Sequence, residues 1–322
     1  MWQNLFVIKF LKMIIKLCFR QVVLFFKFVY SHKLLFLIVF SSCFLLAKIE
    51  SEIKSINKEE KNFDLAFYPF GDFSNSNQSF WGVAPLISYS PSDFYGIGIG
   101  LISSSVGKNF YGIDIGGIYT LTENKFYGLN FAGLFSSSVE GFVGVQASGL
   151  VAGAVGTKSY GVQLAGLFSQ NEDFRGLQLS GLISSSISDF YGLQISGLAS
   201  AAIGDFYGVQ INGLASIACF DFNGIQISGL GNLLATNAFC EDNCTHCQEI
   251  IFNGVQLAII GNVVSANFSG LQIGALGSYV QRDFSGLQIG LINRVDGNLK
   301  GVQIGLWNMS KQGSMPLINI RF

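Results

Sequence analysis

Residues 190–205 read FYGLQISGLASAAIGD, and residues 206–221 repeat the pattern as FYGVQINGLASIACFD. Within the segment 191–197, apolar residues at odd positions alternate with Gly, Gln and Ser at even positions. A period of two is typical of a β-strand, here with one apolar face and one small polar face. A helix is excluded because glycine recurs too often and serine-rich turns interrupt every copy.

The same unit recurs along most of the chain, with the consensus F-x-G-[LVI]-Q-[IL]-x-G-L-x-S followed by a short variable stretch. Successive copies lie 15 to 17 residues apart, except for one interval of 30 residues that contains an insertion. Tandem copies at a fixed spacing indicate a repeat fold in which each unit packs on its neighbours. The repeat glycines are Gly96, Gly112, Gly128, Gly144, Gly161, Gly176, Gly192, Gly208, Gly224, Gly254, Gly270, Gly286 and Gly301.

A glutamine lies two residues after the glycine in the last ten copies, whereas the first three copies carry Gly98, Asp114 and Asn130 there. Identical side chains stacked in register form a hydrogen-bonded ladder, which is the interpretation we favour. The same column would otherwise line a polar pore or bind an extended ligand. Its members are Gln146, Gln163, Gln178, Gln194, Gln210, Gln226, Gln256, Gln272, Gln288 and Gln303.

Two all-β architectures fit this pattern. In a closed β-barrel, each 16-residue repeat forms one membrane-crossing strand or a short hairpin, with Leu, Ile and Tyr facing lipid. Further strands near 63–70, 79–89 and 314–322 then bring the strand total to sixteen. In the alternative, a β-solenoid, each repeat forms one coil. The charged fraction of 12% favours the barrel, because a free solenoid normally exposes more Lys and Glu to water.

A hydrophobic, helical signal segment is predicted over residues 1–47. Residues 34–47, LLFLIVFSSCFLLA, are apolar and follow Lys27 and Lys33. They are too short for a membrane-spanning helix, which needs about 20 residues, but they fit the core of a secretory signal. Cleavage near Ala47 is favoured, with lipidation of Cys43 as the alternative. Residues 48–62 then form a charged linker, and residues 63–322 form a single all-β repeat domain with a Cys-rich loop at 235–250.

Charge is unevenly distributed between these parts. Residues 1–62 hold ten Lys and Arg against four Asp and Glu, whereas residues 63–322 hold nine against sixteen. A mildly acidic body offers no track for a phosphate backbone, so nucleic acid is excluded as a partner. A membrane is the expected partner, and a host or surface ligand is not specified by the sequence.

The Cys-rich loop reads FCEDNCTHCQE at 239–249. Cys240, Cys244, His246 and Cys247 are chemically suited to zinc, and the cysteine spacing also matches a radical-type iron–sulfur site. We favour a disulfide-stapled surface loop, because an exported protein folds in an oxidising compartment. Two bridges are possible if Cys219 takes part.

Catalysis is not expected. The only histidines are His32 and His246, so no Ser-His-Asp arrangement is available. The acidic residues of the repeats lie mainly in the turns between strands, and no paired acid and base is identified among them. We therefore expect no enzyme activity and no cofactor.

The tandem units, the segment 67–90 (FYPFGDFSNSNQSFWGVAPLISYS) and the closing segment 305–322 (GLWNMSKQGSMPLINIRF) resemble the leptospiral surface-repeat family. The closing segment, which ends in Phe322, is also similar to the last strand of outer-membrane barrels. The resemblance implies export to an outer membrane or cell surface, with no established chemistry. The expected function is a structural or interaction role there, with an outer-membrane pore and a metal-binding protein as alternatives.

Overall fold

A computed structural model describes residues 70–72, 81–84, 87–90, 93–234 and 251–322. The contacts divide the chain into Met1–Ala66 and Phe67–Phe322, and all described residues belong to the second unit. The signal segment, the linker and the Cys-rich loop lie outside the described residues.

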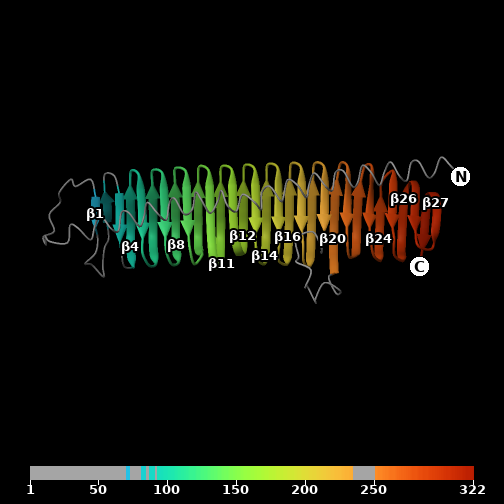
Figure 1. The fold of residues 1–322 in the computed structure, drawn as a ribbon, viewed down its shortest axis with the longest axis horizontal. Helices are drawn as coiled ribbons and strands as arrows, with labels where there is room; N and C mark the ends of the chain where they lie inside the picture. Colours follow the sequence, from blue (N-terminus) through green and yellow to red (C-terminus); the bar gives the residue numbers. More distant parts are fainter. Residues whose placement is uncertain (1–69, 73–80, 85–86, 91–92, 235–250) are drawn as a thin grey trace. The chain divides into compact units, whose positions relative to one another are not determined.

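Each repeat forms one coil that contains a long and a short strand. In one coil, β14 (Phe190–Ser196) is followed by a two-residue corner and β15 (Ala199–Ala202). The equivalent strands of the next coil pair with them in parallel, so that Gly192 lies opposite Gly208 and Ser200 lies opposite Ser216. The fold is therefore a β-solenoid with two parallel columns of strands, and the coils follow one another in chain order (Figure 1).

The long-strand column comprises β2 (Trp81–Ala84), β4 (Phe94–Gly100), β6 (Phe110–Gly116), β8 (Phe126–Ala132), β10 (Phe142–Ser148), β14, β16 (Phe206–Asn212), β18 (Phe222–Ser228), β20 (Ile251–Ala258), β22 (Asn267–Gly274) and β24 (Phe284–Ile289). The short-strand column comprises β1 (Phe70–Asp72), β3 (Ile87–Ser90), β5 (Ser103–Val106), β7 (Tyr119–Thr122), β9 (Phe135–Ser138), β13 (Ile183–Ser186), β15, β17 (Ala215–Ala218), β19 (Gly231–Leu234), β21 (Gly261–Val264), β23 (Gly277–Val280) and β25 (Ile292–Val295).

Three strands contribute to both columns, namely β11 (Val151–Ala165), β12 (Phe168–Ser180) and β26 (Leu299–Ser310). The last strand, β27 (Gly313–Arg321), reverses direction and pairs antiparallel with β26. The solenoid therefore ends in a hairpin rather than in another coil.

The predicted closed barrel is wrong, and the alternative, the solenoid, is the fold. A barrel of successive up and down strands, or a ring of hairpins, needs antiparallel neighbours. Here each long strand pairs in parallel with the long strand of the next coil, and one repeat supplies two strands rather than one. The low charge did not require a barrel, because the solenoid keeps an apolar surface outward without many charged residues.

The inner face of the long strands holds the core. Phe190, Gly192, Gln194 and Ser196 occupy the inward positions of β14, so the predicted alternation is present with its polar side inside. Phenylalanine recurs at the first inward position, where Phe206 and Phe222 are fully buried. Neighbouring rings stack with centroids 5.0 to 5.9 Å apart. The core is therefore a column of aromatic rings beside a column of amides.

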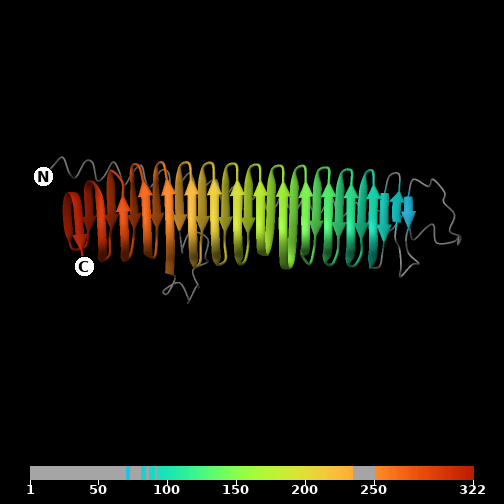
Figure 2. The same ribbon diagram turned by 180° about the vertical axis from the view of Figure 1, so that it is seen from behind.

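The strand axes keep nearly the same orientation from one end of the stack to the other, so the sheets show little twist, as both views show (Figures 1 and 2). Sheets of many strands normally twist, and flat ones are stabilised by stacking or by side-chain ladders. The phenylalanine and glutamine columns supply such ladders here. In the described part of the chain, no helix is long and apolar enough to cross a membrane.

Candidate functional site

The ten glutamines form one continuous internal ladder. All ten side chains are fully buried. Nine hydrogen bonds connect them, in which each Nε2 donates to the Oε1 of the previous glutamine at 2.7 to 3.1 Å. Asn319 of β27 donates to Gln303 at 2.9 Å and extends the ladder into the terminal hairpin. The side chains thus fill the interior and satisfy one another.

In the first three coils, Gly98, Asp114 and Asn130 occupy the position of the ladder glutamines. Asp114 is fully buried, and neither carboxyl oxygen completes a hydrogen bond. Gly98 provides no side chain on one side, and on the other side Asn130 Oδ1 accepts a hydrogen bond from Thr120 Oγ1 at 2.6 Å. Burial raises the pKa of Asp114 to about 7, although the nearby Ser104 hydroxyl and Ile115 amide oppose the rise. Asp114 is therefore a buried acid that titrates near neutral pH.

Replacing one rung of the ladder should destabilise the solenoid. In Gln210→Met, Gln194 Oε1 loses its donor and Gln226 Nε2 loses its acceptor. Each buried polar group left unsatisfied costs about 1–3 kcal/mol, so we expect a loss of about 3 kcal/mol in unfolding free energy. Urea denaturation followed by circular dichroism measures it.

The matched control is Val209→Met, at the adjacent outward position of the same strand. It changes side-chain size without touching the ladder, so its effect should stay within about 0.5 kcal/mol. Equal losses in the two variants would contradict a stabilising role of the amide ladder.

An uncovered aliphatic face runs along the outside of the long strands. It consists of two outward columns on the strands and a third column at the corner that follows each strand. All of its members are intermediate or exposed in accessibility. We call this surface the aliphatic face; its members are Ile97, Ile113, Leu129, Val145, Val162, Leu177, Leu193, Val209, Ile225, Val255, Leu271, Leu287 and Val302; Ile99, Ile115, Phe131, Ala147, Leu164, Leu179, Ile195, Ile211, Ile227, Leu257, Ile273, Ile289 and Ile304; and Ile102, Ile118, Leu134, Leu150, Leu167, Leu182, Leu198, Leu214, Leu230, Ile260, Leu276, Leu291 and Leu306.

The two edges of this face differ. Stacked tyrosines border it in several coils, and the rings of Tyr191 and Tyr207 lie 4.9 Å apart. Beyond them the turns are acidic in the middle of the solenoid, where the amide of Asp205 donates to Asp189 and the amide of Asp221 donates to Asp205. These bonds fix successive turns in register and place carboxylates along one edge.

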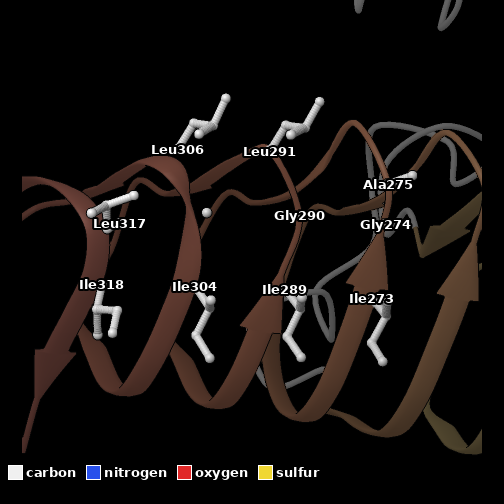
Figure 3. Close-up of a pocket in the computed structure, with 11 residues that line it drawn as sticks. Ile273, Gly274, Ala275, Ile289, Gly290, Leu291, Ile304, Leu306, Leu317 and Ile318 are labelled. Atoms are coloured by element: carbon white, nitrogen blue, oxygen red, sulfur yellow. The ribbon is translucent and has the colours of Figure 1, made fainter.

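Near the C-terminal end the aliphatic face is hollowed into an open groove of about 600 Å³. Ile273, Ile289, Ile304 and Ile318 form one wall and point the same way, whereas Leu291 and Leu306 project from the opposite wall (Figure 3). Gly274, Ala275, Gly290 and Gly305 also line the groove. The lining is almost wholly apolar, so the groove suits aliphatic side chains or hydrocarbon rather than a polar ligand.

The other predicted site residues are distributed differently. Cys43 and the candidate metal ligands Cys240, Cys244, His246 and Cys247 lie outside the described residues. Cys219 is buried. Among the described residues, no group of three or more His, Cys, Asp or Glu side chains is placed to hold a metal ion.

The buried state of Asp114 and the C-terminal groove were not predicted from the sequence. Asp114 could have been found as an acidic residue at a repeat position that later copies fill with glutamine. The outward face could have been found from the apolar residues that recur at the outward positions of every copy. No family model, curated protein or solved structure matches this chain.

Proposed function

We propose that this protein is an exported, non-catalytic repeat scaffold of the outer membrane or cell surface. The observation that carries the proposal is the aliphatic face, because repeat proteins use long continuous surfaces for binding. Its members are uncharged in every coil from Ile97 to Leu306. The glutamines are instead directed inward, where they bond to one another.

The signal-like segment supports the exported location. Its apolar core at 34–47 follows basic residues, which is the order found in secretory signals. The low charge of the repeat domain supports a place at or near a membrane rather than in a crowded cytosol.

Export is tested by placing charges in the apolar core. In the double variant Leu37→Arg and Val39→Arg, the core becomes too polar for secretion, so the uncleaved chain should remain in the cytoplasm. The unaltered chain should appear in the envelope fraction, shorter by about 47 residues, or by 42 with a lipidated Cys43. Cell fractionation, mass spectrometry and protease treatment of intact cells measure these outcomes.

The matched control is Ile53→Arg in the predicted linker, which should leave export unchanged. An unaltered chain that stays full-length in the cytoplasm would refute the proposal. So would a double variant that is exported as efficiently as the control.

A further inference from the structure

The sheet of long strands leaves its outer face uncovered. Among the described strands, every pairing in this sheet is parallel except that of β26 with β27. Parallel sheets normally have both faces covered, because their strands are apolar on both sides. Here the inner face is covered by the core, and the outer face exposes side chains such as Phe131 (41%), Ile225 (37%) and Ile227 (36%). Monomeric soluble proteins rarely expose a contiguous apolar patch larger than a few hundred Å².

We propose that the aliphatic face is the interface with a second copy of this chain, packed face to face. Strand and rung spacings give the face a length of roughly 60 Å, a width of roughly 20 Å and an area above ~1,000 Å². A stable protein interface needs about 800 Å² from each partner. The face therefore has the area that a stable dimer requires.

The periodicity of the face suits a copy of itself. Side chains such as Ile195, Ile211 and Ile227 repeat at the spacing of the coils. A partner whose coils have the same spacing can match these rows of side chains along the full length of the face. Rows from two copies would then interdigitate as they do in packed sheets. The C-terminal groove between the isoleucine and leucine walls would receive such a row of side chains from the second copy.

The charged edge favours a copy of the chain over a lipid surface. Helices and faces that bind membranes carry Lys and Arg beside their apolar surface, which attract anionic lipids. The edge of this face instead carries Asp189, Asp205 and Asp221 in its middle coils. A two-fold axis parallel to the stack would place the acidic edge of one copy over the glycine–leucine corners of the other, which avoids opposing carboxylates.

Sedimentation equilibrium of the purified protein, in the form in which the cell processes it, tests the proposal. The unaltered chain should be a dimer at micromolar concentration. The double variant Leu179→Lys and Ile195→Lys should weaken the dimer at least about 100-fold, because it buries two unpaired charges in the centre of the interface. Both side chains point outward, so circular dichroism should show an unchanged fold.

The matched control is Gln170→Lys and Ser185→Lys, at outward positions of the short-strand column in the neighbouring coils. This variant should remain dimeric. An unaltered chain that is monomeric would overturn the proposal, and so would a dimer that survives the Leu179→Lys and Ile195→Lys changes. A monomer that floats with vesicles of phosphatidylethanolamine and phosphatidylglycerol would assign the face to lipid and would also overturn it.

Discussion

Gly208→Ala is expected to destabilise the solenoid by more than about 5 kcal/mol, beyond the range of ordinary point substitutions. The Cβ atom of the new side chain would lie 1.9 Å from the carbonyl oxygen of Gly192 in the previous coil. The φ angle of Gly208 is also +146°, a backbone conformation that L-residues rarely adopt. Relief would require β14 and β16 to separate, and this would break their parallel pairing.

The matched control is Gly231→Ala. Its added Cβ would come no closer than 3.2 Å to another atom, and Ala215 already occupies the equivalent position of the preceding coil. Thermal unfolding of both variants, with hydrogen exchange of β16, separates the two cases. If Gly208→Ala and Gly231→Ala unfold at similar temperatures, close approach of the coils at Gly208 does not constrain the fold.

The second large effect concerns pH. The pKa of Asp114 rises from an ordinary value of 3.8 to about 7 in the folded protein. Below pH 3.8 the acid is protonated in both states, so its burial carries no charge penalty. As pH rises towards 7, the unfolded chain releases the proton while the folded chain retains it, and folding loses about 4 kcal/mol. Above about pH 7 both states are ionised and the loss stays constant.

Asp114→Asn should remove this dependence. The amide is neutral at every pH, so the variant should exceed the unaltered protein by about 4 kcal/mol at pH 8 and differ little near pH 4. Urea denaturation at several pH values measures the slope, and Glu140→Gln at an exposed turn position is the control. A slope that is unchanged in Asp114→Asn would show that other groups set the pH dependence.

The repeat and its alternation could be predicted from the sequence, because the period of two around Gln194 places the same residues on the same face in any β-structure. The pairing partner could not be predicted in this way. A barrel strand and a solenoid strand share the same alternation, and they differ in whether the neighbouring strand is parallel or antiparallel. That difference depends on the corners, which the consensus describes least well.

The segment Ser184-Ser185-Ser186 shows why the second strand was missed. Serine is common in turns, and the sequence interpretation assigned this stretch to a turn. In the structure it belongs to β13, and Ser184 Oγ contacts the hydroxyls of Ser169 and Ser196 at 3.2 and 2.7 Å. Hydrogen bonds between coils therefore override the weak strand preference of serine, and a single repeat considered alone contains no such partners.

The long interval between β19 and β20 has a consequence for how such a gene can change. Gln226 and Gln256 are 30 residues apart, yet they form the same 2.9 Å amide bond as rungs that are 16 residues apart. The pairing of Phe222 with Phe252 is likewise unshifted. Unequal recombination between copies should therefore add or delete whole coils in frame, so alleles that differ in length by one unit should remain foldable. The junction after Leu234 also becomes a natural point for inserting a peptide tag.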